Sequence, residues 1–301
     1  MNLGHFKSMD AGYRSLVDSV GALGYPYQPR GMDSVEVRPA QFTVSDPRLG
    51  LYTGRSRRLN YRFLAIETLS YIAGWGDERH AGLMVDANKN VAKFVNQNTG
   101  RFDGAYGPRF KVGIRDAVES LYKDRSSRQA VASVWSPGVP SDSLDVPCTL
   151  SLQFYRSGER KLGMVATMRS NDLNWGTPYD VAAFSAIQLA VASCLGLEPG
   201  EYHHHAGSLH YYLNTPPEVT LQVSERFEPV VGWPPYQNYH VGLHPVEAWD
   251  LLVRGANSVL ESAYAVRKGL RRSPWSEVSG GHSSESGWVL MIRNGGREAS
   301  S

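Results

Sequence analysis

A single cysteine beside a proline is the residue of this chain best suited to nucleophilic chemistry. Cys148 lies in the stretch DVPCT at residues 145–149, directly before an apolar segment. A nucleophilic cysteine must become a thiolate, which needs a positive or hydrogen-bonding environment. Arg30, Arg128 and Arg169 are candidate donors. Their spacing leaves open whether they meet Cys148, and an isolated cysteine is more often a small core residue.

Two further stretches carry groups that suit a nucleotide. Residues 168–180 read MRSNDLNWGTPYD, in which Arg169 and Ser170 offer a forked cation and a hydroxyl for phosphate oxygens. Residues 207–212 read GSLHYY, with two polar rings that share one face of a strand and suit a sugar hydroxyl. The alternatives are a capped turn before a helix for the first stretch and a surface cross-strand pair for the second.

These side chains need elements that position them, and the sequence predicts most of them. The first fifty residues read as loops and short strands. Apolar spacing, proline starts and glycine stops predict helices over 60–73, 178–194 and 245–267, and strands over 129–135, 149–155, 161–168 and 203–213. The tail from Ser279 is predicted to be mobile. Without βαβ regularity, the class is α+β.

The bulk composition bounds the function. The chain has 301 residues, which suits a single domain over 1–301, and a net charge of +2 from 31 basic and 29 acidic side chains. That balance argues against a dedicated nucleic-acid binder. Two cysteines imply no disulfide framework, and no apolar run resembles a signal peptide or a membrane span. We therefore expect a cytoplasmic protein without nucleic-acid or membrane partners.

Taken together, these stretches resemble the thymidylate synthase superfamily over residues 25–215. Their order and approximate separations are jointly specific, although no single stretch is decisive. The resemblance rests on Arg30-Gly31, the helix with Glu67, Ala105-Tyr106-Gly107, Ser127-Arg128, Pro147-Cys148, Arg169-Ser170-Asn171-Asp172, Gly176, and residues 207–214. It implies a thymidylate synthase-like α+β fold whose mixed sheet forms the interface of a homodimer, with 5,10-methylenetetrahydrofolate as the one-carbon donor.

The resemblance also implies roles by position. Cys148 matches the nucleophile that adds to C6 of a pyrimidine, and Glu67 and Tyr106 match residues that manage water and proton transfer around C5. The implied nucleotide ligands are Arg30, Arg169 and Ser170 for the phosphate, His210 and Tyr212 for the 3′-hydroxyl, and Arg128 reaching the phosphate of the partner subunit. Asp172 and Gly176 match the folate site.

Asp180 is the informative departure, because typical thymidylate synthases have asparagine there. An asparagine amide complements the N3–H and O4 of uracil, whereas an ionised carboxylate only accepts and suits the N4 amino group of cytosine. A proton shared with N3 would complete the pair. Such a mismatch can reject the wrong base by ~10⁴-fold. Asp180 therefore predicts a cytidylate substrate, although an aspartate near a helix N-terminus is also favoured by the dipole.

Two smaller departures agree with this interpretation. Thr149 follows the nucleophile where histidine is usual, and Ser208 replaces the aspartate of Gly-Asp-x-His. Both resemble the deoxycytidylate hydroxymethylases of T-even phages and the cytidylate hydroxymethylases of nucleoside-antibiotic pathways. We therefore expect a hydroxymethyltransferase acting on CMP or dCMP, with Asp180 among the catalytic and nucleotide-binding residues. The alternatives are reductive methylation of a uridylate and a non-catalytic nucleotide-binding or RNA-binding protein.

Several features stay open or point elsewhere. Gln129 stands where the family commonly has a second cross-subunit arginine, and the tail lacks the usual short apolar ending. Ribose and deoxyribose substrates are not distinguished. His203–His205 invite a metal site, but neighbouring strand residues point to opposite faces, so no metal is predicted. Cys194, in an apolar helix, reads as core.

Overall fold

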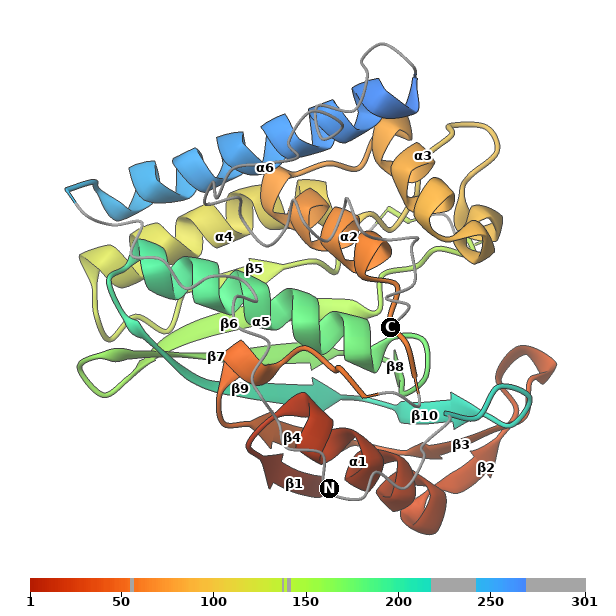
Figure 1. Cartoon of the computed structure of the whole chain (residues 1–301). Helices are drawn as coiled ribbons and strands as arrows, with labels where there is room; N and C mark the ends of the chain where they lie inside the picture. The colour runs from red at the N-terminus through yellow and green to blue at the C-terminus, as the bar shows by residue number, and fades with distance from the viewer. Residues whose placement is uncertain (55–56, 137, 140–141, 218–241, 269–301) are drawn as a thin grey trace, which may run out of the picture.

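The structure is a computed structural model that describes residues 1–54, 57–136, 138–139, 142–217 and 242–268 (Figure 1). Its α-helices are α1 (Met9–Leu23), α2 (Tyr61–Ala73), α3 (Glu78–Ala87), α4 (Tyr106–Lys123), α5 (Thr177–Cys194) and α6 (Pro245–Arg267). Its strands are β1 (Asn2–Phe6), β2 (Tyr25–Tyr27), β3 (Ser34–Val37), β4 (Ala40–Val44), β5 (Val131–Ser133), β6 (Thr149–Ser157), β7 (Lys161–Met168), β8 (Asn171–Asp172), β9 (Glu198–Ala206) and β10 (Leu209–Tyr212). The predicted tail from Ser279 lies outside the described residues.

Two mixed sheets organise these strands. The larger has the order β1-β4-β9-β7-β6-β5, with β1–β4 and β7–β9 parallel and the other neighbours antiparallel. The smaller has the order β2-β3-β10-β8, in which only β8 and β10 are parallel. The predicted α+β class with a mixed sheet is confirmed.

The chain crosses between the two sheets at three places, and these crossings lie together. β3 leads into β4, β7 into β8, and β9 into β10. The backbone N–H of Gly207 donates to Met168 O at 2.8 Å, and that of Asn171 donates to Ser208 O at 2.8 Å. The two polar stretches that the sequence analysis singled out therefore run side by side at the junction of the sheets.

Helix α5 forms the centre of the core. Residues Val181–Leu189 are all buried, which is why the helix is apolar all round rather than on one face. It packs on β7 and β9 on one side and on α2, α4 and α6 on the other (Figure 1). The Gln188 amide within it donates to Leu162 O and Gly200 O at 2.9 and 3.0 Å. Its first turn, with Asp180, starts at the sheet junction.

The predicted helix over residues 60–73 is confirmed, with both ends where the sequence places them. The Asn60 side chain accepts the Phe63 N–H at 3.0 Å and so caps the first turn of α2. Gly74 ends the helix in the left-handed conformation, with φ 80°, which glycine adopts without a steric cost. The predicted helices over 178–194 and 245–267 are confirmed as α5 and α6.

Two element predictions were wrong. The first fifty residues contain α1, whose buried residues Met9, Tyr13, Leu16 and Val20 follow helical spacing despite two weakening glycines. The predicted strand over 203–213 is two strands in different sheets, interrupted at Gly207. A Cβ there would lie 2.8 Å from Arg169 O, so glycine permits the close approach at the crossing. Helices α3 and α4 are not among the predicted elements.

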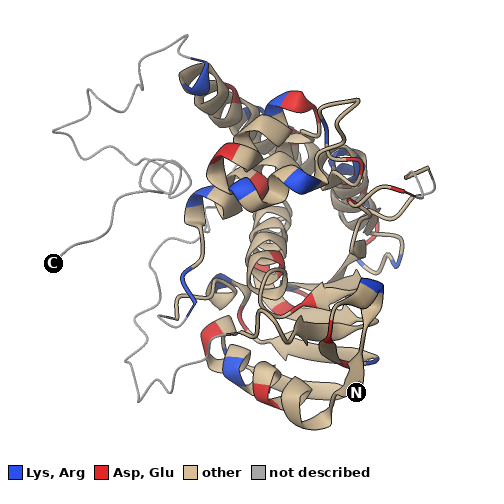
Figure 2. Ribbon diagram, turned by 90° about the vertical axis from the view of Figure 1, so that its right-hand side faces the viewer, with Lys and Arg blue, Asp and Glu red and all other residues tan. Residues whose placement is uncertain are grey.

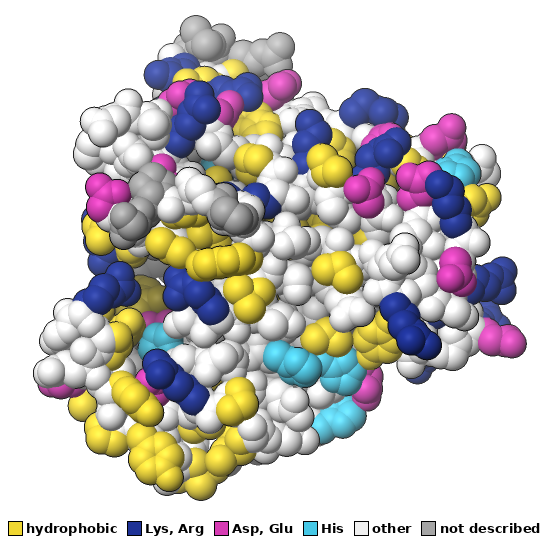
Figure 3. Space-filling view, turned by 180° about the vertical axis from the view of Figure 1, so that it is seen from behind, with side chains coloured by type: hydrophobic (Ala, Val, Ile, Leu, Met, Phe, Trp, Pro, Cys, Tyr) yellow, Lys and Arg dark blue, Asp and Glu magenta, His cyan; other side chains and the backbone are white. Residues whose placement is uncertain are grey.

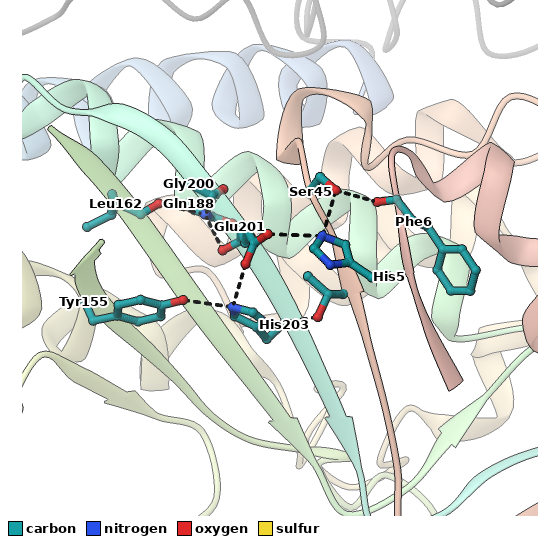
Figure 4. A network of polar contacts seen from close by, with 10 residues as sticks. His5, Phe6, Ser45, Tyr155, Leu162, Gln188, Gly200, Glu201 and His203 are labelled. Carbon is teal, nitrogen blue, oxygen red and sulfur yellow. Dashed lines mark hydrogen bonds and ion pairs between the residues drawn. The ribbon is translucent and has the colours of Figure 1, made fainter. Parts of the chain in front are cut away.

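The face of the large sheet turned away from α5 carries an ordered polar network (Figure 4). His203 bonds Tyr155 Oη at 2.9 Å and Thr43 Oγ1 at 3.0 Å, and Glu201 pairs with His5 at 3.1 Å. Gly163 lies between Tyr155 and the histidine strand, where any Cβ would collide with the Tyr155 ring. Histidine side chains gather on this side of the molecule (Figure 3).

The three consecutive histidines alternate between the two faces of β9, as expected for a strand. His203 and His205 face outward, whereas His204 is buried, stacks on Phe42 at 4.7 Å and bonds Tyr202 Oη at 2.8 Å. In the described part of the chain, no group of histidine, cysteine and acidic residues has a metal-binding arrangement.

Neither the distribution of charged residues nor the hydropathy of the described helices marks out a binding surface. Lysine, arginine, aspartate and glutamate are interspersed along the described ribbon rather than gathered on one face (Figure 2). No described helix combines the length and apolar character that crossing a bilayer requires. The absence of nucleic-acid and membrane partners stays a prediction.

Candidate active site

Cys148 lies directly before β6, and hydrogen bonds fix its backbone. The N–H groups of Cys148 and Thr149 both donate to Tyr106 Oη at 3.1 Å, which ties the start of β6 to the first turn of α4. The Cys148 carbonyl accepts the Arg169 N–H at 2.8 Å across the end of β7. The thiol therefore sits at the sheet junction, beside the crossing that carries Arg169.

Opposing charges act on the Cys148 thiol. Burial raises its pKa, Arg169 and Arg30 lower it, and the carboxylates of Asp180 and Asp145 raise it further. The Arg169 Nη2 lies 3.6 Å from Sγ, so one guanidinium N–H points at the sulfur. A thiolate formed here would be stabilised by Arg169 and Arg30, two of the three candidate donors from the sequence.

Backbone carbonyls hold the Arg169 side chain, and Arg30 stands out by its backbone conformation. Arg169 donates through Nε to Pro147 O at 2.8 Å and through Nη2 to Val146 O at 2.9 Å, which presses its guanidinium along the segment before the nucleophile. Arg30 adopts φ 54° and ψ 31°, and it is the one non-glycine residue with positive φ in the described ranges. That conformation costs about 1 kcal/mol or more, which makes it a marker of a functional turn.

Two carboxyl groups face the same region. Burial, reinforced by the Asp180 carboxylate, raises the pKa of Glu67 to about 8, while a hydrogen bond with Tyr71 opposes the shift. Burial raises the pKa of Asp180 to about 7, opposed by a hydrogen bond from Asn171. Asp180 also raises the pKa of Tyr106 and Cys148, so nucleophile, phenol and both carboxyls act on one another. Perturbed groups clustered in this way are typical of a catalytic site.

The Asp180 carboxylate is oriented by Asn171, which lies where the chain crosses from β7 to β8. Asn171 Nδ2 donates to Asp180 Oδ2 at 2.7 Å, and Asn171 Oδ1 accepts the Thr177 hydroxyl at 2.6 Å. A Cβ at Gly176 would lie 3.1 Å from Asp180 Oδ2 and 3.0 Å from Asn171 Nδ2. Gly176 therefore leaves room for the pair, a role that its position in the sequence did not suggest.

Asp172 and Trp175 lie in the turn before α5, at the edge of the cluster formed by Cys148 and Asp180. The Asp172 carboxylate accepts the N–H groups of Asn174 and Trp175 at 2.6 and 3.0 Å, which closes the turn before α5. Trp175 is 49% exposed, and the Arg57 guanidinium lies 5.2 Å from its ring centroid. An exposed indole beside a carboxylate and a cation suits a flat heterocycle that carries an acidic tail.

His210 and Tyr212 lie on β10 next to Asp172. Their rings meet edge to face at 5.3 Å, and β10 pairs His210 with Glu36 on one side and Asp172 on the other. His210 Nδ1 lies 3.3 Å from Ser208 Oγ. Burial lowers the pKa of His210, although the neighbouring carboxylates of Asp172 and Glu36 oppose that shift.

The carboxylate behind His210 comes from a neighbouring strand. Ser208 Oγ donates to Glu36 Oε2, and Arg38 pairs with Glu36 Oε1 at 2.8 Å. Glu36 is buried, so this ion pair satisfies a charge that would otherwise be costly. Glu36 and Arg38 are missing from the predicted site residues, because only the β3–β10 pairing brings them to His210.

Two predicted residues are not joined to this cluster by any described contact. Arg128 lies on the surface after α4 and lines a pocket of about 570 Å³ with Asp116, Ser120 and Lys123. Ser170 is half-buried between Arg169 and Asn171, and its side chain makes no hydrogen bond with the described residues. The other predicted residues meet at the sheet junction.

A family model supplies the comparison that decides the identity. The model for thymidylate synthase matches residues 12–234, which run from the first turn of α1 past the end of β10 and include every residue of the cluster described above. The chain belongs to the thymidylate synthase family. Enzymes of this family use methylenetetrahydrofolate.

Individual members of the thymidylate synthase family show the same relationship. A deoxyuridylate hydroxymethyltransferase of Bacillus phage SP01 is 31% identical over 240 residues, which cover 73% of this chain and 60% of that protein. A thymidylate synthase of Phytoplasma mali is 25% identical over 178 residues, covering 54% of this chain and 62% of the relative. A thymidylate synthase of Equine herpesvirus 2 is 34% identical over 117 residues, which cover 38% of this chain and 40% of that protein. The chain thus spans between 40% and 62% of these relatives.

Proposed function

We propose that this thymidylate synthase family member transfers a hydroxymethyl group to C5 of CMP or dCMP. The observation that supports a cytidylate substrate is the position of Asp180. Its carboxyl group is oriented by Asn171 and lies within electrostatic reach of Cys148. Its pKa of about 7 makes both its protonated and its ionised forms accessible near neutral pH. A cytosine ring can share that proton at N3 while its amino group donates to the carboxyl oxygen.

The chain's own residues support the chemistry at the ring. The Cys148 thiolate, stabilised by Arg169 and Arg30, adds to C6 and makes C5 electron-rich. After a one-carbon unit is attached, loss of the C5 proton and expulsion of the thiolate restore the ring. Glu67, with its pKa near 8, is suited to move a proton through water beside Tyr106.

Asp172, Trp175, Gly176 and Arg57 would hold the folate. Their donor set fits a pterin and a negatively charged tail, since an exposed indole, a carboxylate and a guanidinium lie at that edge of the cluster. Methylenetetrahydrofolate, when bound, supplies a one-carbon unit at the oxidation level of formaldehyde, so that capture by water gives a hydroxymethyl group and leaves tetrahydrofolate. Hydride transfer is not needed.

The remaining predicted residues bind the nucleotide. Arg30, Arg169 and Ser170 suit the phosphate, and the edge-to-face pair of His210 and Tyr212 suits the 3′-hydroxyl. We further propose a homodimer through the outer face of the large sheet, in which Arg128 reaches the partner's phosphate. In support, Arg128 lies away from the cluster of its own chain, on the surface after α4.

A second candidate is action on a uridylate. The relative of Bacillus phage SP01 is named a deoxyuridylate hydroxymethyltransferase, and other relatives are named thymidylate synthases. A fully protonated Asp180 could also pair with uracil, as a carboxylic acid both donates and accepts. Reductive methylation of a uridylate would oxidise the folate to dihydrofolate, which distinguishes it from hydroxymethylation.

An assay with CMP, dCMP, UMP and dUMP side by side tests the proposal. We expect turnover of a cytidylate with methylenetetrahydrofolate, a 5-hydroxymethyl product by mass, and no dihydrofolate absorbance. Cys148→Ala should abolish release of tritium from C5, a loss of at least ~10⁴-fold for a deleted nucleophile. Asp180→Asn should shift preference toward uridylate. Exclusive turnover of uridylates by the wild type would refute the cytidylate assignment.

A further inference from the structure

A carboxyl group that shares a proton does not by itself choose between cytosine and uracil. With the proton on the oxygen that faces N3, it pairs with N3 and the N4 amino group of cytosine. With the proton on the other oxygen, it pairs with O4 and N3–H of uracil instead. Base selection by Asp180 therefore needs a neighbour that makes its two oxygens unequal.

We infer that Asn171 is that neighbour: its amide keeps the proton off Asp180 Oδ2, which makes Asn171 a positioning residue that determines base specificity. The inference rests on the proposed function and goes beyond it, because Asn171 is not among the predicted site residues. It acts through Asp180, and no contact of Asn171 with the base itself is involved.

The contact distances favour one orientation of the Asn171 amide, in which the Thr177 hydroxyl donates to Asn171 Oδ1 rather than to Asp172 O, its longer alternative acceptor at 3.1 Å. The Thr177 oxygen lies 2.6 Å from Asn171 Oδ1, a distance typical of O–H···O bonds and short for a neutral N–H···O bond. The Asn171 nitrogen lies 2.7 Å from Asp180 Oδ2, as charge-assisted N–H···O⁻ bonds do. Asn171 is buried, at 2% exposed, so water does not compete for either bond.

This orientation makes Asp180 asymmetric. Oδ2 accepts from Asn171 and is a poor place for a proton, while Oδ1 has no hydrogen-bond partner among the described residues and is free to carry one. A base then meets a fixed donor at Oδ1 and a fixed acceptor at Oδ2. In the orientation that the proposed function requires, Oδ1 faces N3 and Oδ2 faces the exocyclic group. Cytosine then satisfies both atoms, whereas uracil presents its donor and acceptor in the opposite order. Uracil requires the amide to flip, so that the Thr177 hydroxyl accepts from the Asn171 N–H and donates to Asp172 O, 3.1 Å away, in place of its 2.6 Å bond to Asn171 Oδ1.

The charges around Asp180 keep its ionisation near neutral. Burial raises its pKa to about 7, and the Asp172 carboxylate adds to the shift. The titratable groups that interact with it from the surrounding elements are Glu67 and Tyr71 on α2, Tyr106 on α4, Cys148 before β6, Asp172 on β8 and Tyr202 on β9. No cation is among them, so the amide of Asn171 is the group that breaks the symmetry of the carboxyl.

The test compares kcat/KM for cytidylate and uridylate in the full-length protein. Asn171→Ala and Thr177→Val should lower the cytidylate-to-uridylate ratio, by about tenfold or more for Asn171→Ala, which corresponds to ~1.4 kcal/mol. Thr177→Ser keeps the hydroxyl and should keep the ratio. Asn174→Ala is the matched control: it removes an amide from the same turn, bonded to Thr215 O rather than to Asp180.

A second measurement separates specificity from simple damage to the fold. Nucleotide binding by calorimetry across pH should show the pKa of Asp180 raised in Asn171→Ala, because the lost hydrogen bond favoured the ionised form. If Asn171→Ala fails to fold, the Thr177→Val and Thr177→Ser pair gives the same comparison. An equal loss for both bases, with an unchanged ratio, would overturn the inference. A uridylate preference of the wild type would instead overturn the proposed function, before any variant is compared.

Discussion

At the scale of single residues, the site depends on two carboxyl groups that each disfavour ionisation of the other. The Asp180 carboxylate contributes to the raised pKa of Glu67, and both groups are shifted mainly by burial. Both shifted values, about 8 and about 7, lie close to neutral pH, where a group can accept and return a proton. The same shifts make these residues costly to stability when they are ionised.

The first prediction concerns Asp180→Asn and the pKa of Glu67. Removing the neighbouring charge should lower the pKa of Glu67 below about 8, and the corresponding limb of the pH profile of kcat should move to lower pH. The residual turnover of whichever nucleotide the variant accepts supplies the profile. An unmoved limb would mean that Glu67 and Asp180 do not interact.

The same substitution should also change stability with a defined sign. Asp180 has a folded pKa above its unfolded value, so the folded state favours the protonated form and loses stability as pH rises from ~4 through about 7. Asp180→Asn removes that loss. Its melting temperature should exceed that of the wild type more at pH 8 than at pH 5. Asp18→Asn, at an exposed carboxylate, should show no such difference.

At the scale of elements, Asn60 joins three helices that frame the site. Its side-chain oxygen caps α2, its Nδ2 donates to Ala87 O of α3 at 2.7 Å, and its backbone N–H donates to the Tyr179 hydroxyl of α5 at 2.8 Å. Since α2 carries Glu67 and α5 carries Asp180, this residue links the elements that hold the two carboxyls.

The second prediction follows from that cap. Asn60→Ala should lower the free energy of unfolding by ~1–2 kcal/mol, because an N-cap bond and the Ala87 contact are both lost. Asn60→Ser keeps a capping oxygen and should cost less. Urea denaturation measures both, and an alanine variant as stable as the serine variant would contradict the capping role.

Some elements could be predicted from the sequence because their signals are local. The cap at Asn60 and the stop at Gly74 bound α2, and the mostly apolar stretch after Thr177 belongs to a helix buried on almost every side. The break between β9 and β10 could not be predicted in this way. It exists because Gly207 passes close to Arg169 O, a contact between residues that are distant in sequence.

At the scale of the whole molecule, the proposed homodimer would share each site between two subunits. Cys148, Arg30 and Arg169 come together within one chain, whereas Arg128 lies in a surface pocket after α4. In a symmetric dimer each site would combine Cys148 of one chain with the partner's Arg128, so that neither subunit alone holds a complete phosphate site.

The third prediction is complementation between two inactive variants. Cys148→Ala and Arg128→Ala should each be impaired, but a mixture that exchanges subunits should recover about a quarter of wild-type activity, because half of the dimers then contain one intact site. Each variant mixed with itself is the control. Recovery that fails although subunit exchange is shown by mass would exclude Arg128 from the partner's site.

The fourth prediction concerns acid stability. Burial lowers the pKa of His80 to about 4 and that of His204 to about 3, so the folded protein holds both neutral. These bases have folded pKa values below ~6.5, hence stability is lost as pH falls below that value. His80→Leu removes this pH dependence. Its free energy of unfolding, compared with that of the wild type, should therefore be about 2 kcal/mol higher at pH 5 than at pH 8. Equal effects at both pH values would contradict a buried neutral His80.

The sequence by itself determined the chemical types: a cysteine after proline, an arginine–serine pair, an aspartate where asparagine is usual, and the helices with local caps. Tertiary structure alone decided that Asn171 makes the oxygens of Asp180 unequal, that Glu36 of a neighbouring strand supports His210, and that Arg128 lies apart from them. The physical reason is that side-chain chemistry belongs to each residue, whereas hydrogen bonding and burial depend on which strands cross beside one another.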